Sequence, residues 1–153
     1  MDTSVDIRNY LPHREPMLMV DLILTIDALS VETVFLIKED NIFVDKNTFI
    51  EAGLIENVAQ TCSSIVAQKY FAKTDEEENV SVIGFISTLK NLKIYQLPKV
   101  NNSIITRASL VSKFVGDDYT LCTMNCESFH GEVQLIECEI NLFIQKTNSL
   151  VKN

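Results

Sequence analysis

The chain has 153 residues, a formal net charge of −8 and a hydrophobic content of 46%, which suits a single domain, residues 1–153, with one core. No run of about 18 apolar residues occurs, so we expect no membrane-spanning helix. The acidic balance disfavours broad nucleic-acid binding, which needs a basic face. The N-terminus lacks a basic start followed by an apolar run, so we expect no secretory signal and a cytoplasmic protein.

The cysteines and histidines give little support for a metal site. The chain has four cysteines and two histidines, and no Cys-x-x-Cys pair occurs. We therefore predict no metal and no cofactor, and we interpret the cysteines as reduced thiols of the core. They are Cys62, Cys122, Cys126 and Cys138.

The first 47 residues predict an arm followed by two strands. Residues 1–16 are polar and end in Leu-Pro-His-Arg-Glu-Pro, where two prolines forbid a regular helix, so an extended or turned arm is expected. The apolar run 17–26 predicts a strand buried on both faces, or a short helix. Alternation over 31–38 predicts a second strand, and 39–47 is expected to form a polar loop.

A long helix is expected over roughly 50–72, with its centre in 53–68. At about 100° per residue the apolar side chains of 53–68 occupy one arc, and the opposite arc is polar but almost uncharged. A surface helix normally carries Lys and Glu on its outer side, so we interpret this helix as buried on most sides. Glu56 is the single ionisable carboxylate of 53–68, and a buried carboxylate is costly unless it is paired, hydrogen-bonded or protonated.

The rest of the chain predicts an acidic loop over 74–79 and then a set of mostly antiparallel strands. The last strand has the cleanest alternation, with Ile136, Cys138 and Ile140 on one face and Glu137 and Glu139 on the other. One buried helix against one antiparallel sheet is an α+β arrangement, and the sheet must curl around the helix. The expected strands are 80–88, 90–100, 103–115, 119–129 and 133–146, with hairpin turns at 116–118 and 130–131.

Two segments of the chain resemble one enzyme family. Leu-Pro-His-Arg-Glu-Pro-Met-Leu-Met-Val-Asp (11–21) is similar to the opening motif of hotdog-fold β-hydroxyacyl-acyl-carrier-protein dehydratases, and Glu-Asn-Val-Ala-Gln (56–60) is similar to the Glu-Ala-Met-Ala-Gln of their central helix. The Pro-Met after His-Arg most resembles the ApeP-like branch, whose members sit in aryl-polyene and flexirubin pigment clusters. The resemblance implies a hotdog fold, in which an antiparallel sheet wraps one long central helix. It also implies a lyase that converts 3-hydroxyacyl thioesters to 2-enoyl thioesters, as in fatty-acid synthesis.

The chain departs from this family at the general base. The housekeeping dehydratases carry a His-Phe-Pro segment ahead of the helix glutamate, whereas the window 39–45 contains no histidine. The Pro-Gly that precedes their helix is also altered, to Glu-Ala-Gly (51–53). The usual catalytic dyad is therefore only half present.

Dehydration needs a base for the C2 proton, an acid for the C3 hydroxyl and a donor to the thioester carbonyl. The match to the family helix motif assigns Glu56 the acid role, with a buried structural carboxylate as the alternative. His13 is the hypothesised replacement base, and the alternative is that it anchors the arm. His130 precedes Gly131 in a predicted turn, so we expect it to be an exposed turn residue.

Three further residues are candidates for substrate binding. The backbone amides near Gly53, at the helix N-terminus, are proposed to hold the thioester carbonyl. Gln60 lies one turn after Glu56 and is expected to orient it, although a packing or interface amide is the alternative. Arg14 is a candidate for the same pocket or an anchor of the arm.

The resemblance also implies partners. These are acyl carrier protein with its acyl-phosphopantetheine, and either a second copy of the chain or another dehydratase in a heterodimer. Acyl carrier proteins are acidic, as this chain is, so docking must use a local basic patch. The candidates are Lys90, Lys93, Lys99 and Arg107, with solvated surface cations as the alternative.

Two other functions stay open at this point. The chain is alternatively a catalytically weak partner subunit of a heteromeric dehydratase or ketosynthase complex, which the missing His-Phe-Pro segment favours. An acyl thioesterase is the third possibility, because hotdog thioesterases also place a carboxylate on the central helix, but the Leu-Pro-His-Arg opening argues against it. Turnover of 3-hydroxyacyl and acyl thioesters by the purified protein separates the three.

Overall fold

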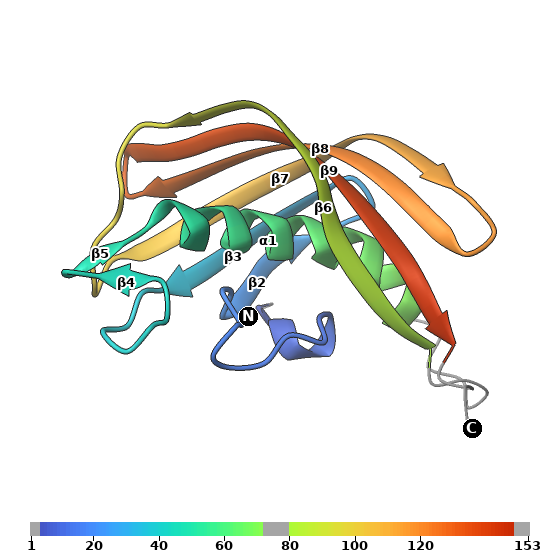
Figure 1. The fold of residues 1–153 in the computed structure, drawn as a ribbon, viewed down its shortest axis with the longest axis horizontal. Helices are drawn as coiled ribbons and strands as arrows, with labels where there is room; N and C mark the ends of the chain where they lie inside the picture. Colours follow the sequence, from blue (N-terminus) through green and yellow to red (C-terminus); the bar gives the residue numbers. More distant parts are fainter. Residues whose placement is uncertain (1–3, 72–79, 149–153) are drawn as a thin grey trace.

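A computed structural model describes residues 4–71 and 80–148 and shows an antiparallel sheet arched over one long helix (Figure 1). The sheet has seven strands in the order β1-β2-β3-β7-β8-β9-β6. This arrangement confirms the predicted α+β hotdog architecture. Residue 72 of the predicted helix and the predicted acidic loop 74–79 lie outside the described residues.

The elements follow one another along the chain in the order expected for this architecture. The strands of the large sheet are β1 (Val5–Asp6), β2 (Leu22–Ile26), β3 (Ser30–Leu36), β6 (Val80–Ile94), β7 (Ser103–Val115), β8 (Tyr119–His130) and β9 (Val133–Asn148). The other elements are the short 3-10 helix η1 (Ile7–Asn9), the small sheet of β4 (Val44–Asp45) and β5 (Thr48–Phe49), and the helix α1 (Glu51–Phe71). No helix in the described part of the chain combines the length and the hydropathy needed to cross a membrane.

Helix α1 is buried on most sides, as its uncharged polar arc predicts. Its apolar side chains, such as Leu54 and Val58, are fully buried, and so are the polar Asn57 and Thr61. Buried polar groups need partners, and Thr61 finds one in Thr33 of β3, with the two hydroxyl oxygens 2.8 Å apart. The helix therefore fills the arch of the sheet with contacts on several faces.

The inner face of the sheet forms the other side of the core. In β9, Ile136, Cys138, Ile140, Leu142 and Ile144 are buried, which confirms the predicted alternation. All four cysteines are buried thiols that are not joined in disulfides. The hydrogen bond with Cys126, together with burial, raises the pKa of the Cys138 thiol, so it stays protonated. The prediction of reduced core thiols is confirmed.

Two predicted strands differ from the structure. Residues 17–21 form an irregular segment before β2, in which Met19 and Val20 are fully buried while Met17 and Asp21 are exposed. The backbone of Met19 bonds to side chains of α1 instead of a neighbouring strand, so the apolar run reflects burial and not an extended ladder. The segments 80–88 and 90–100 were expected as separate strands, but the residues up to Ile94 form one strand whose pairing with β9 is irregular at two places. Such bulges break the alternation of a continuous strand.

The predicted polar loop 39–47 contains a small hairpin. Strand β4 pairs with β5 through a tight turn at Lys46 and Asn47, both of which have positive φ angles, 48° and 67°. Asparagine tolerates this left-handed conformation better than most residues, and two such residues make a two-residue hairpin turn. The hairpin leads directly into the first turn of α1.

Strand β6 forms one edge of the sheet and carries exposed apolar side chains. Ile83, Phe85 and Ile86 are 43%, 53% and 39% exposed. On the outer face, Phe85 begins a cross-strand row that runs through Phe143, Leu121 and Phe114 by strand register. An edge of this length with apolar side chains is a typical place for another chain to pair.

Candidate active site

His13 and Glu56 lie next to each other, although they are far apart in the sequence. The Nε2 atom of His13 is 3.9 Å from the Oε1 atom of Glu56, and the side chains are 30% and 26% exposed. His13 comes from the arm between η1 and β2, and Glu56 from the N-terminal part of α1. The separation is too long for a direct hydrogen bond, but it lets both groups reach adjacent atoms of one bound molecule.

Gln60 connects the carboxylate of Glu56 to the arm. Its Nε2 donates to Glu56 Oε1 at 2.9 Å and to the Met17 carbonyl at 2.8 Å, and its Oε1 accepts from the Met19 amide at 2.7 Å. Gln60 is 1% exposed, so these bonds form in a dry environment where they are strongest. The predicted contact between Gln60 and Glu56 is thus present, and the same amide also fixes the arm.

Arg14 folds back onto the arm. Its Nη1 donates to the carbonyls of Leu11 at 2.9 Å and His13 at 2.7 Å, and its Nη2 to the carbonyl of Arg8 at 3.5 Å. A guanidinium that satisfies three backbone carbonyls stabilises the turned shape of its own segment. This geometry favours the anchoring alternative for Arg14 over a direct contact with substrate.

The imidazole of His13 is half-buried beside a small apolar cavity of about 30 Å³, whose lining includes Tyr10, Ser63, Gly84 and Ile144. Its Nδ1 atom is buried and has no hydrogen-bond partner among the described residues. Burial lowers the pKa of His13 below its usual 6.5, and the carboxylate of Glu56 opposes this shift. The imidazole is therefore neutral near pH 7 and able to accept a proton.

Gly53 packs tightly and its amide is occupied. The amide donates to the carbonyl of Ile50 at 3.0 Å. A Cβ atom at Gly53 would lie 2.6 Å from the Phe49 ring and 2.8 Å from Cβ of Phe43, so only glycine fits. That hydrogen bond occupies the Gly53 amide itself, and the role of the backbone amides near Gly53 in holding a thioester carbonyl stays a prediction.

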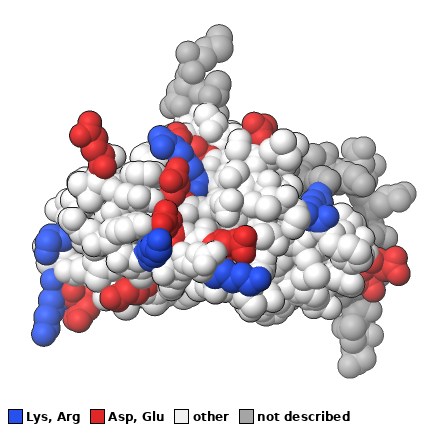
Figure 2. Space-filling model, turned by 90° about the horizontal axis from the view of Figure 1, so that it is seen from above, with Lys and Arg blue, Asp and Glu red and all other residues white. Residues whose placement is uncertain are grey.

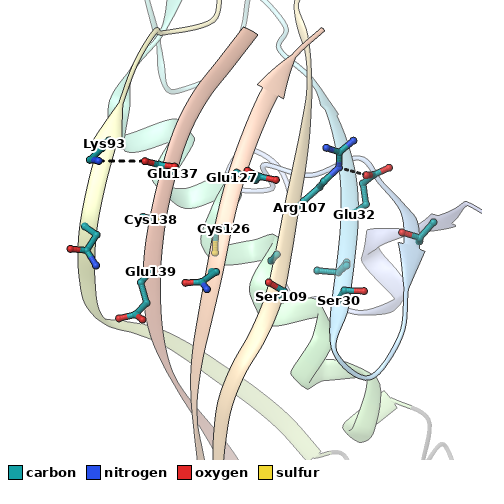
Figure 3. A pocket seen from close by; sticks show the side chains of 15 residues that line it. Ser30, Glu32, Lys93, Arg107, Ser109, Cys126, Glu127, Glu137, Cys138 and Glu139 are labelled. Carbon is teal, nitrogen blue, oxygen red and sulfur yellow. Dashed lines mark hydrogen bonds and ion pairs between the residues drawn. The ribbon is translucent and has the colours of Figure 1, made fainter. Parts of the chain in front are cut away.

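A larger hollow lies elsewhere, on the outer face of the sheet (Figure 3). It has a volume of about 580 Å³ and a polar lining that includes Glu127. Two of the predicted docking cations are here, each in an ion pair. Lys93 Nζ is 3.7 Å from Glu137 Oε1, and Arg107 Nε is 2.6 Å from Glu32 Oε2. His13 is not part of its lining, and four carboxylates, Glu32, Glu127, Glu137 and Glu139, outnumber the two cations there.

The other two predicted docking cations do not complete an isolated basic patch. Lys90 is the register partner of Glu139 in β9, and Lys99 lies beyond β6, bridged to Thr48 of β5. Viewed from above, acidic and basic side chains alternate over the sheet (Figure 2). His130 was expected as an exposed turn residue, but it is the last residue of β8, partly buried and paired with Val133, and the turn follows at 131–132. Its Nδ1 is 3.0 Å from the Ser103 carbonyl oxygen.

Comparison with known protein families identifies one match over nearly the whole chain. The model of the family described as "ApeP-like: ApeP dehydratase" matches residues 5–152. The chain belongs to the ApeP-like dehydratase family. A search of curated proteins gives no match for this ApeP-like dehydratase.

Solved structures resemble the ApeP-like dehydratase in fold. The dehydratase heterocomplex ApeI:P from Xenorhabdus doucetiae superposes with a TM-score of 0.76 at 13% identity, over 95% of this chain and 93% of that chain. Cj0977, a virulence protein from Campylobacter jejuni, gives a TM-score of 0.60 at 12% identity, over 89% and 81%. A hypothetical thioesterase with coenzyme A from Streptococcus pneumoniae gives 0.55 at 8% identity, over 83% and 87%. At these identities the likeness shows the hotdog fold alone.

The sequence analysis missed a buried polar chain beside the site of this ApeP-like dehydratase. Asn57 Nδ2 donates to the Met19 carbonyl at 2.7 Å, and Thr106 Oγ1 donates to Asn57 Oδ1 at 2.6 Å. The Ser128 hydroxyl lies 2.7 Å from Thr106 Oγ1. The sequence did hold a signal, because uncharged polar residues on a buried helix need buried partners. In their strands, Thr106 and Ser128 occupy positions that alternation places on the inner face of the sheet.

Proposed function

We propose that this ApeP-like dehydratase removes water from 3-hydroxyacyl thioesters carried on acyl carrier protein and gives 2-enoyl thioesters. The observation that carries the proposal is the approach of His13 Nε2 to Glu56 Oε1 within one chain. The histidine of the family's His-Phe-Pro segment is missing, and His13 on the arm places an imidazole beside the Glu56 carboxylate instead. An aryl-capped or plain acyl chain of the pigment pathways is the substrate class that the family resemblance suggests.

Each group has one proton to move in this mechanism. Neutral His13 accepts the C2 proton through Nε2, and the C–H electron pair forms the C2–C3 double bond. The reacting form of the protein carries a protonated Glu56, and the C3–O bond breaks as Glu56 gives this proton to the departing hydroxyl, which leaves as water. Transfer of a proton from the imidazolium to the carboxylate then restores both groups, and their proximity makes this transfer direct or possible through one water.

The test of this function is turnover by the purified chain. We expect mass spectrometry to show loss of one water from a 3-hydroxyacyl carrier, and no release of free acid from an acyl carrier. Release of free acid would instead establish a thioesterase. Activity that requires a second hotdog dehydratase would establish the partner-subunit alternative, which the heteromeric nature of the ApeI:P structure makes a specific candidate.

The open edge at β6 is the surface through which we expect the chain to assemble. The exposed Ile83 and Phe85 lie on this edge strand of 15 residues, and pairing with the edge of another hotdog subunit would satisfy its free backbone groups. We expect light scattering at micromolar concentration to give the mass of a homodimer, or of a heterodimer once a partner dehydratase is added. A monodisperse monomer under both conditions contradicts this prediction.

Carrier docking through Lys90, Lys93, Lys99 and Arg107 remains a proposal. The ion pair of Lys93 with Glu137 means that an acidic carrier must compete with that carboxylate. Charge reversal of Lys90 and Lys93 to Glu is expected to weaken carrier binding about tenfold, because local electrostatics steers such encounters. Turnover of a small thioester mimic stays at the wild-type rate. Lys38→Glu, a reversal at an exposed site before β4, is the matched control, and equal losses on carrier and mimic would refute the docking site.

A further inference from the structure

We propose that Asn57 is a positioning residue, which holds the arm through Met19 and so sets the place of His13 beside Glu56. The catalytic part of this inference rests on the proposed function, whereas the anchoring part is independent of it. Asn57 follows Glu56 directly in α1, but its side chain is 1% exposed and points to the arm and sheet instead of the site.

The hydrogen bonds of Asn57 belong to a chain with a fixed direction. The Thr106 hydroxyl has one proton and donates it to Asn57 Oδ1, so it accepts from the hydroxyl of Ser128. Asn57 Nδ2 then donates to the Met19 carbonyl. This series of hydrogen bonds thus runs from β8 through β7 and α1 to the arm. In it, each side chain determines the orientation of the next.

Met19 is held from both sides of its backbone. Gln60 accepts from its amide at 2.7 Å, while Asn57 donates to its carbonyl at 2.7 Å. Asn57 and Gln60 lie one turn apart on α1, and their two bonds together fix the position and the orientation of the Met19 backbone. Loss of the Asn57 bond leaves the Met19 carbonyl without its side-chain donor, while Gln60 and the pairing of Asp21 with Val34 still hold the segment. The backbone at Met19 is then less tightly placed.

His13 depends on this backbone anchoring because its side chain makes few bonds of its own. Its Nδ1 has no hydrogen-bond partner among the described residues, and its Nε2 lies 3.9 Å from Glu56. The imidazole is placed by the arm that carries it and by packing in the small cavity. A displaced arm therefore moves the imidazole away from Glu56 and into water.

The experiment follows the titration of His13 by NMR, which is clean because the chain has only two histidines. Glu56 is the charged group that acts on His13, and its effect is smaller than that of burial. Loosening the arm therefore raises the pKa of His13 toward 6.5 as burial is lost. We expect this rise in Asn57→Ala and, to a smaller extent, in Thr106→Val, with His130 unchanged as the internal reference.

Thr61→Val is the matched control. Thr61 and Thr106 are both fully buried, and the hydroxyl of each takes part in a hydrogen bond between α1 and the sheet. The bond between Thr61 and Thr33 does not lead on to the arm. We expect Thr61→Val to lower the melting temperature as Thr106→Val does while leaving the His13 titration and kcat at wild-type values. In Asn57→Ala, kcat falls at least tenfold, KM changes little, and the acid limb of the pH profile moves upward.

A wild-type His13 titration in Thr106→Val and in Asn57→Ala would overturn the proposal and leave Asn57 as an ordinary core amide. If Asn57→Ala does not fold, Thr106→Val, which keeps the shape of its side chain, decides the question. If the wild-type chain has no dehydratase activity, the titration still tests the anchoring, so failure of the proposed function and failure of this inference are distinguishable.

Discussion

Glu56→Gln is expected to abolish dehydration while the protein stays folded. The substitution keeps the size of the side chain, and the new amide oxygen can accept the bond that Gln60 Nε2 gives to Glu56 Oε1. It removes the proton that the departing hydroxyl needs. A positioned acid contributes about 10²- to 10⁴-fold to such a rate, so turnover falls by at least that factor, toward the background reaction. The measurement is single-turnover mass spectrometry of a 3-hydroxyacyl carrier.

Glu51→Gln is the matched control for this substitution. Glu51 lies in the first turn of the same helix and its side chain is exposed. It makes the same change of charge without touching the site, and we expect wild-type turnover. Melting temperatures of both variants, compared with the parent, separate loss of chemistry from loss of fold. Full activity of Glu56→Gln would end the catalytic assignment of this carboxylate.

His13→Ala is expected to lower the rate by about 10²- to 10⁴-fold, which is the usual contribution of a general base. The pH dependence gives a second measurement. Burial lowers the pKa of His13, so in the wild type the acid limb of kcat/KM, where the imidazole takes up a proton, has its midpoint below pH 6.5. In His13→Ala this acid limb disappears from the residual rate.

His130→Ala serves as the control, because it removes the other imidazole at a site where Nδ1 contacts the Ser103 carbonyl. We expect it to keep both the rate and the acid limb. Addition of free imidazole offers a rescue experiment, since the alanine leaves space next to the small cavity beside Glu56. A His13→Ala protein with wild-type kcat/KM and an unchanged acid limb would mean that the arm histidine has only an anchoring role.

The sequence predicts well those elements that have one regular pattern of buried side chains. Helix α1 and strand β9 each have one clear pattern of burial, and both agree with the predicted limits to within about two residues. The order of the elements, with one helix between two sets of strands, was sufficient for the α+β class. The segments 17–21 and 80–94 were harder, because side-chain anchors and bulges replace regular pairing there.

The candidate site is partly predictable for a similar reason. Glu56 and Gln60 follow from their spacing on one helix, since residues four apart are neighbours. The approach of His13 was only a hypothesis, because no local pattern reports a contact between an irregular arm and a helix. The bond from the Gly53 amide to the Ile50 carbonyl could not be predicted, since it depends on the turn that precedes α1. Asn57 is a polar residue of the predicted helix, but its partners in β7 and on the arm come from distant parts of the chain.

The origin of His13 and Glu56 in one polypeptide has a genetic consequence. Where the acid and the base of one site come from different subunits, two inactive alleles can complement each other, because a mixed dimer contains one site in which both residues are intact. Here the two groups lie 3.9 Å apart in the same chain. With the proposed catalytic roles and the proposed dimer, every mixed dimer of His13→Ala and Glu56→Gln subunits would contain only defective sites. Intragenic complementation between these alleles should therefore fail, and one wild-type subunit should retain its full activity beside an inactive partner.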